Sequence, residues 1–321
     1  MTITSEDRAT TRTFEELFDR ICSNVGVAIR GKDDVIRLTV TCLLARGHLL
    51  LEDVPGVGKT SLAKALARSV DARFGRVQFT PDLLPSDVLG SSVWNQADGT
   101  FEFRPGPVFT QLLLGDEINR ASPKTQSALL EAMAEEQVTV DGTTYPLHRP
   151  FMVMATQNPL DHHGTFPLPE SQLDRFLMKL SIGYPGRQDE LALLREEDHD
   201  RTLAELSPVA SAADILAMSE AARGVHVAES LAAYLVDLAD RSRRSAHLSL
   251  GISPRASLGL LRAARVWAAA SGRNFVTPDD LKELAVPVLA HRVMVGTDGR
   301  LSGATAEESI LELLRATPVP A

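Results

Sequence analysis

The chain has 321 residues, a length that suggests about two domains, with an ordinary globular content of 44% hydrophobic and 23% charged residues. Its net charge of -9 gives no overall attraction to nucleic acid or to an anionic membrane. No apolar stretch is long enough to cross a membrane and the N-terminus has no apolar signal core, so we expect a cytoplasmic protein without a transmembrane segment.

The N-terminal part of the chain predicts a short tail, two helices and then a strand. Residues 1–12 are polar and are expected to be flexible. Thr13 and Glu16 have the spacing of a capping box and predict a helix that begins there, and a second helix fits 33–46. The apolar run 48–52 predicts a strand that leads into a glycine-rich loop and a further helix.

Four more apolar runs follow, at 76–80, 111–115, 151–156 and 176–182, with helical patterns between them. One of these helices fits 122–137, with Ser122 as its cap and Pro123 in its first turn. Strands that alternate with helices predict an α/β fold with a parallel sheet covered on both faces.

Two inserts interrupt this alternation, and the pattern then changes. Residues 93–103 and 138–147 each alternate around an Asp-Gly pair, Asp98-Gly99 and Asp141-Gly142, which predicts two β-hairpins. Beyond about residue 185 only helical patterns remain. We therefore expect an α/β core at 13–185 and an all-α domain at 186–321.

The loop "DVPGVGKT", residues 53–60, nearly matches the phosphate-binding pattern G-x-x-x-x-G-K-[ST] and lies between a strand and a helix. Its backbone N–H groups and the helix N-terminus can wrap a phosphate, Lys59 can reach the terminal phosphates of ATP, and Thr60 can hold Mg²⁺. The candidate nucleotide-binding residues are Pro55, Gly56, Val57, Gly58, Lys59, Thr60 and Ser61.

Asp53 stands where the pattern has its first glycine. An inward carboxylate would repel a polyphosphate, so we expect Asp53 to face away from the loop and to serve as a turn residue. Asp tolerates unusual backbone angles, and its carboxylate could accept a hydrogen bond from the backbone N–H two residues on.

Polar residues end two later strands, at the sheet edge where ligands bind in such folds. Asp116 is expected to support the Mg²⁺ shell with Thr60, and Glu117 to accept a proton from an attacking water. Asn158 is suited to contact the γ-phosphate or orient that water, although Asn-Pro is also an ordinary turn.

Two arginines are further candidates, each with a plainer interpretation. Arg175 follows Asp174 just before a strand, where an ion pair is the commoner role. Arg255 lies in the first turn of a helix capped by Ser253, where a cation opposes the helix dipole and suggests an anionic partner such as bound phosphate.

Together these motifs resemble those of AAA+ ATPases. The phrases "EDVPGVGKT", "GDEINRASPKTQSALLEAM", "ATQNP", "FPLPESQLDRF" and "GISPRA" are similar to the MoxR group in particular, as are the two hairpins. The resemblance covers nearly the whole chain beyond the first dozen residues.

The resemblance implies an AAA+ core followed by a lid domain, with ATP and Mg²⁺ as cofactors. It implies an oligomeric ring, usually a hexamer, in which Arg175 is an arginine finger that reaches the neighbouring subunit's nucleotide. Arg255 would sense the γ-phosphate in cis. The implied work is chaperone-like remodelling or metal insertion, often with partner proteins that carry von Willebrand factor A domains.

Three alternatives stay open. The nearest is the ATPase subunit of a magnesium-chelatase-like complex. A P-loop kinase is disfavoured by Glu117 and by a lid that carries Arg255, and a DNA-dependent motor is disfavoured by the acidic chain.

Other residues have simpler interpretations. The basic cluster Arg241, Arg243 and Arg244 is expected to be a solvated helix end, Cys22 and Cys42 to be buried reduced thiols, and the adjacent His162 and His163 to make a poor metal pair. Arg120 is either a solvated residue or part of the nucleotide interface. Trp94, Phe101 and Phe103 either pack on the domain or grip a client.

Overall fold

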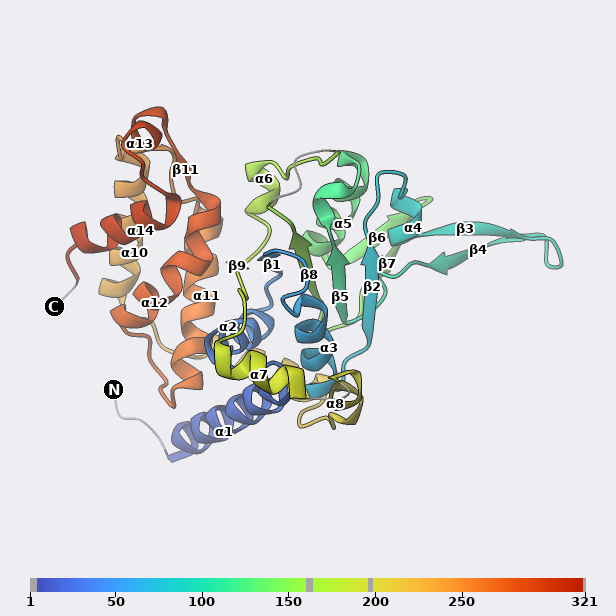
Figure 1. Ribbon diagram of the computed structural model, residues 1–321, viewed down its shortest axis with the longest axis horizontal. Helices are drawn as coiled ribbons and strands as arrows, with labels where there is room; N and C mark the ends of the chain where they lie inside the picture. The colour runs from blue at the N-terminus through green and yellow to red at the C-terminus, as the bar shows by residue number, and fades with distance from the viewer. Residues whose placement is uncertain (1–4, 160–163, 196–198, 320–321) are drawn as a thin grey trace.

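The centre of the molecule is a five-stranded parallel sheet, described here from a computed structural model that covers residues 5–159, 164–195 and 199–319. Its strand order is β2-β5-β8-β1-β9, and each neighbouring pair is parallel (Figure 1). The strands are β1 (Leu49–Glu52), β2 (Phe74–Gln78), β5 (Leu112–Asp116), β8 (Met152–Gln157) and β9 (Met178–Leu180). The predicted parallel sheet is therefore confirmed.

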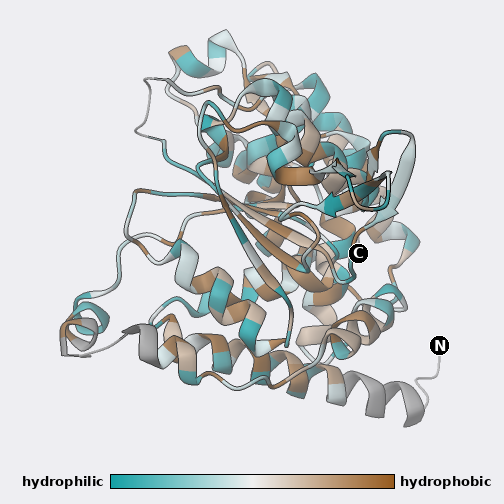
Figure 2. Ribbon diagram, turned by 90° about the vertical axis from the view of Figure 1, so that its right-hand side faces the viewer, coloured by the Kyte–Doolittle hydropathy of each residue, from teal (hydrophilic) through white to brown (hydrophobic). Residues whose placement is uncertain are grey.

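Both faces of this sheet are buried, which explains the near-continuous apolar runs of its strands. Along β1, Leu49 and Leu51 pack on one face and Leu50 packs on the other, and all three are fully buried. The strands form the brown, hydrophobic centre of Figure 2. Because side chains alternate across a strand, one short run of leucines supplies two separate hydrophobic cores.

The helices of the α/β part flank the sheet. They are α1 (Ser5–Ala28), α2 (Asp33–Leu44), α3 (Lys59–Ser69), α4 (Pro85–Leu89), η1 (Ile118–Arg120), α5 (Pro123–Glu135) and α6 (Glu170–Leu173). The predicted cap at Ser122 is confirmed, since its side chain accepts from Thr125 N. The predicted start at Thr13 is wrong, because α1 already begins at Ser5; the spacing of a capping box also occurs within a helix, where residues i and i+3 are neighbours.

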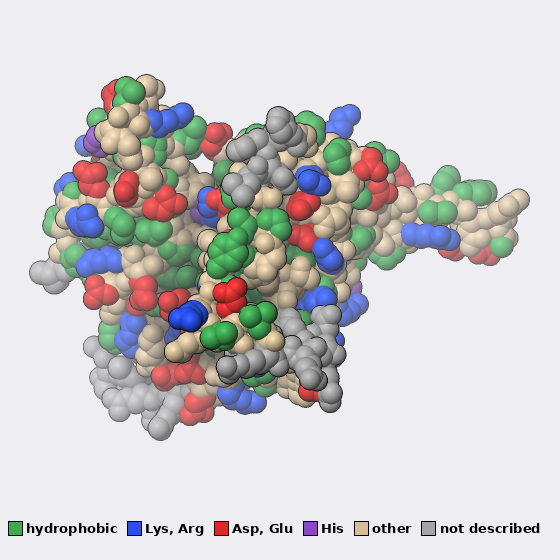
Figure 3. All heavy atoms as spheres, in the orientation of Figure 1, with side chains coloured by type: hydrophobic (Ala, Val, Ile, Leu, Met, Phe, Trp, Pro, Cys, Tyr) green, Lys and Arg blue, Asp and Glu red, His purple; other side chains and the backbone are tan. Residues whose placement is uncertain are grey.

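Two antiparallel hairpins interrupt the alternation, as predicted: β3 (Gly90–Asn95) with β4 (Thr100–Pro105), and β6 (Gln137–Val140) with β7 (Thr143–Pro146). The second turns on Asp141 and Gly142, both at positive φ, as expected for a two-residue turn. The first has a four-residue connection, closed by Gly99 N donating to Asn95 O at 2.9 Å. Figures 1 and 3 show that the β3–β4 hairpin projects away from the rest of the molecule.

The remainder of the described chain is helical apart from a small antiparallel sheet of β10 (Leu248–Leu250) and β11 (Met294–Val295). Its helices are α7 (Arg187–Arg195), α8 (His199–Glu205), α9 (Ala212–Arg223), α10 (Glu229–Arg244), α11 (Pro254–Ala270), α12 (Pro278–Leu289), η2 (Ala290–Arg292), α13 (Thr297–Leu301) and α14 (Ala306–Ala316). Among the described residues, no helix combines the length and apolarity that a membrane crossing requires.

Candidate functional site

A cavity of about 340 Å³ lies where β1, β5 and β8 end, at the C-terminal edge of the sheet. It is lined by Pro55, Gly56, Gly58, Lys59, Thr60, Ser61, Asp116, Glu117, Thr156 and Asn158. We call this set of residues the loop edge. Fold topology therefore brings together three sequence segments that were predicted as candidates independently.

The loop has the shape of an anion cradle. Gly56 and Gly58 have φ angles of 85° and 95°, and no atom lies within 4 Å of the position that a Cβ would take at either residue. Lys59 donates from Nζ to the carbonyl oxygens of Asp53 (2.6 Å) and Val54 (3.2 Å). Burial lowers the pKa of Lys59, while nearby carboxylates oppose that shift. These residues fit the polyphosphate of a nucleotide.

A second cavity of about 220 Å³ adjoins the first and shares Gly56, Gly58 and Ser61 with it. It contains Val57, the one predicted loop residue that does not line the first cavity, together with apolar groups from the end of α1 and from the segments that follow α1 and β9. Ile29 and Ile182 are among those groups. A polar cavity joined to a less polar one is suited to a phosphate chain that carries a flat apolar base.

Asp53 is buried and faces away from the cradle. Its Oδ2 accepts hydrogen bonds from Ser181 Oγ (3.0 Å), Ile182 N and Gly183 N (2.9 Å). The predicted orientation is confirmed, but the predicted partner is wrong, because the residue two positions on is Pro55, which has no N–H. Asp53 instead ties the loop entrance to the segment that leads from β9 toward the C-terminal helices.

The two strand-end carboxylates are held by residues that the sequence patterns did not indicate. Asp116 accepts from Thr156 Oγ1 (2.6 Å) and Arg76 (2.7 Å). Glu117 lies at φ 57° and accepts through Oε2 from Gln78, at 3.0 Å. Gln78 and Thr156 lie at or next to the C-terminal ends of β2 and β8, so their position at strand ends was the signal that could have identified them.

The side chain of Arg120 contacts the candidate site, which favours the second of its two interpretations. Its Nε lies 3.2 Å from Glu117 Oε2. Glu117 is therefore oriented by an amide and a guanidinium on the same oxygen, Oε2.

Arg175 lies at the opposite, N-terminal edge of the sheet. It precedes β9, and its Nη1 donates to Leu130 O at 2.6 Å. Since β1 spans four residues, about 13 Å of strand separates the two edges. Arg175 lines neither cavity of the loop edge.

Arg255 is at that same N-terminal edge. It lies in the first turn of α11, whose cap Ser253 donates to Asp174 Oδ1 at 3.2 Å, and its charge acts on His48, just before β1. Arg255 lines neither cavity, so it is not positioned for the predicted cis contact in this arrangement. We call Arg175 and Arg255, with the residues that hold them, the arginine edge.

Arg292 of η2 fastens the C-terminal helices to the arginine edge. Its side chain is 3% exposed, its Nη2 donates to the carbonyls of Asp174 (3.2 Å) and Phe176 (2.7 Å), and its Nε lies 3.5 Å from Asp174 Oδ1. Burial lowers its pKa to about 10. Arg175 therefore lies between two residues that are both held by η2.

The three aromatic residues of the first hairpin separate into two groups. Phe103 stacks on Tyr145 with ring centroids 4.0 Å apart, whereas Trp94 and Phe101 stay 53% and 70% exposed on the projecting hairpin. The basic cluster is the C-terminal end of α10, as predicted. Burial raises the pKa of the Cys22 and Cys42 thiols to about 12. His162 and His163 lie outside the described residues, among which no metal-binding group of side chains occurs.

Comparisons with known proteins agree with this geometry. A family model described as the ATPase family associated with various cellular activities matches residues 48–178, and an AAA lid domain model matches 240–313. The chain is 46% identical to the uncharacterized protein YeaC of Bacillus subtilis over 95% of each chain. It is 39% identical to the chaperone MoxR1 of Mycobacterium tuberculosis over 94% of this chain and 82% of that protein. A crystal structure from Cytophaga hutchinsonii, of a protein inferred to be an ATPase, matches with a TM-score of 0.90 and 36% identity over 99% of this chain and 98% of that chain.

Proposed function

The chain belongs to the MoxR family of AAA ATPases, and from that premise we propose that it hydrolyses Mg²⁺-bound ATP at the loop edge to remodel partner proteins. The observation that carries the proposal is the convergence of the cradle, Asp116, Glu117 and Asn158 on one cavity. A phosphate loop without a water-activating acid would serve a kinase equally well, so the presence of Glu117 supports the proposal of hydrolysis.

Each residue of the loop edge has a proposed role. Backbone N–H groups of residues 56–61 bind the phosphate chain, and Lys59 compensates charge on its terminal groups. Thr60 and Asp116 would hold Mg²⁺, which supplies charge neutralisation at the phosphates when bound. Glu117 accepts the proton of the attacking water through Oε1, and Asn158 orients that water.

Completion of the site requires a second copy. The terminal phosphates need cationic stabilisation during transfer, yet Lys59 is the only cation that lines the loop cavity within the described residues. Arg175 and Arg255 lie together at the other edge, so we assign both to the nucleotide of a neighbouring subunit in a ring, with a hexamer as the proposed state. This places Arg255 in trans, in contrast to the cis role expected from the sequence.

The proposed client is a protein, including partners with von Willebrand factor A domains, and the work includes metal insertion into such partners. The projecting hairpin with exposed Trp94 and Phe101 is the proposed contact surface. MoxR1, the M. tuberculosis relative, is named a chaperone, which supports remodelling as the coarse activity.

A trap experiment tests this function. A Glu117→Gln protein with ATP should retain nucleotide and co-purify with its client, whereas Lys59→Ala should retain neither. If purified wild-type protein, with Mg²⁺ and with its captured partner added back, hydrolyses no ATP, the proposed function is wrong.

A further inference from the structure

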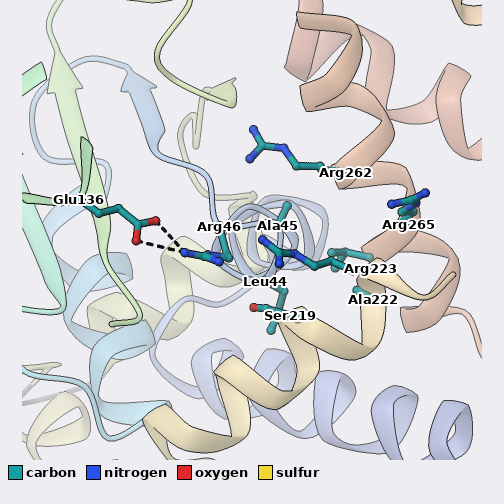
Figure 4. A pocket seen from close by; sticks show the side chains of 10 residues that line it. Leu44, Ala45, Arg46, Glu136, Ser219, Ala222, Arg223, Arg262 and Arg265 are labelled. Atoms are coloured by element: carbon teal, nitrogen blue, oxygen red, sulfur yellow. Dashed lines mark hydrogen bonds and ion pairs between the residues drawn. The ribbon is translucent and has the colours of Figure 1, made fainter. Parts of the chain in front are cut away.

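A separate cavity lies between α2, the end of α5, α9 and α11, on the side of the C-terminal helices and away from the loop edge. It is lined by Leu44, Ala45, Arg46, Glu136, Ser219, Ala222, Arg223, Arg262, Arg265 and Val266. Four of these residues are arginines and one is a glutamate (Figure 4). We call this set of residues the arginine pocket.

The arginine pocket is built on two unusual backbone positions. Arg46 and Glu136 follow α2 and α5 with φ angles of 53° and 51°, in the left-handed region. Glycine normally takes this position after a helix, because a side chain is unfavourable there. Arg46 and Glu136 pair with each other at 2.9 and 3.1 Å. Two side chains are therefore held where the backbone alone would favour glycine.

The single carboxylate does not neutralise the pocket. Glu136 also accepts from Arg149 at 2.7 Å, so both its oxygens are already used by arginines. Arg223 has an exposed partner in Glu220, at 3.2 Å. Neither Arg262 nor Arg265 has an ion pair among the described residues, and the Nε of Arg265 is buried without a hydrogen-bond partner there.

The arginines also act on one another. Arg262 is an exposed residue, yet partial desolvation of its guanidinium lowers its pKa, and the charges of Arg255, Arg46 and Arg223 lower it further. Figure 4 shows Arg262 and Arg223 extending from α11 and α9 toward the side on which Arg46 lies. Arginines crowded around a hollow repel one another unless an anion lies between them.

We propose that the arginine pocket binds a phosphate-class oxyanion that links α2 and α5 of the core to α9 and α11 of the lid. The cavity measures about 90 Å³, which admits one phosphate group but not a nucleotide. Planar guanidinium groups donate in pairs to phosphate oxygens. Bound anion would hold the lid at one position relative to the core, because its ligands come from both.

Phosphate binding to Lys59→Ala protein tests the proposal, since that change weakens the competing cradle at the loop edge. Calorimetric titration with sodium phosphate, at an ionic strength held constant with sodium chloride, measures the second site. The variants are Arg262→Gln with Arg265→Gln, and Arg262→Gln alone, which alters only an exposed residue. The matched control is Arg244→Gln, an exposed arginine of α10 that pairs with Asp240.

We expect Lys59→Ala protein to bind phosphate, the added double change to weaken that binding by about tenfold or more, and the control to leave it unchanged. Pyrophosphate and ADP, run as further titrants, should bind no more tightly than phosphate, because the cavity does not admit a nucleotide. Tighter binding of ADP would contradict the proposed size of the site.

Three results would overturn it. Phosphate could fail to bind Lys59→Ala protein, or could bind it equally with and without Arg262→Gln and Arg265→Gln. The double change could alternatively alter the sedimentation of the assembly with no effect on phosphate binding, in which case the pocket receives an acidic side chain of another copy.

Discussion

The two edges of the central sheet carry different side chains, and under the proposed function they supply complementary halves of one reaction. The loop edge holds the cradle and two carboxylates, and Lys59 is the only cation among its cavity-lining residues. The arginine edge holds Arg175 and Arg255, neither of which lines the cavity at the phosphate cradle. About 13 Å of strand separates the two edges within one chain, which is why the proposed function has them meet between chains.

Loss of Arg175 is expected to produce the largest effect on the reaction. Arg175→Ala should lower kcat by about 10³-fold or more, as for other arginine fingers, with ATP affinity nearly unchanged because Arg175 is remote from its own loop. Steady-state hydrolysis together with nucleotide titration measures both. A large loss of affinity with unchanged kcat would place Arg175 in the binding of ground-state nucleotide.

Loss of Glu117 tests the other edge. Glu117→Gln should keep ATP binding and lower hydrolysis by about 10²-fold or more, because the amide cannot accept a proton. Single-turnover hydrolysis measures the step directly. Persistent turnover would show that the base lies elsewhere, and Glu131→Gln, at an exposed glutamate of α5, is a matched control.

Acid should loosen the arginine edge. Burial lowers the pKa of His48 to about 4 and of His291 to about 3, so both are neutral when folded and take up protons more readily when unfolded. Their stabilisation is complete above the unfolded pKa of about 6.5 and decreases as pH falls toward 4, by about 1.4 kcal/mol per pH unit for each.

Urea unfolding from pH 7 to pH 5 checks this dependence. His291→Gln should flatten the slope, since glutamine can still donate to Phe176 O but does not titrate. His247→Gln, an exposed control, should leave the slope unchanged. An equal slope in all three proteins would contradict the account of the buried histidines.

The smallest effect is expected at Asp53. Asp53→Gly should change ATP affinity by less than about tenfold, because the carboxylate faces Ile182 and Gly183 rather than the cradle. Nucleotide titration of the Asp53→Gly protein measures this affinity. A much larger gain in affinity would show that Asp53 restrains the site.

The sequence predicted the sheet, both hairpins and the loop because each depends on local patterns: apolar runs, Asp-Gly pairs and glycines before Lys59. It did not predict the partners of Asp53, because they lie beyond residue 180 and are brought close only by the pairing of β1 with β9. Gln78 was missed for the same reason, since its contact with Glu117 depends on the pairing of β2 with β5.

The position of Arg255 shows most clearly what could not be predicted from the sequence. A local pattern placed it at a helix N-terminus, which the structure confirms. Its distance from the loop edge depends on where α11 packs, and Ser253 and Arg292 fix α11 and η2 against Asp174 at the far edge. Packing between distant segments is not encoded in any short motif.

Mixed subunits test the separation of the two edges most directly. Lys59→Ala and Arg175→Ala proteins should each be nearly inactive alone, and co-assembled rings should recover hydrolysis because some interfaces join an intact loop edge to an intact arginine edge. Arg255→Ala should complement Lys59→Ala in the same way. No recovery in rings shown by mass to contain both variants would contradict the account.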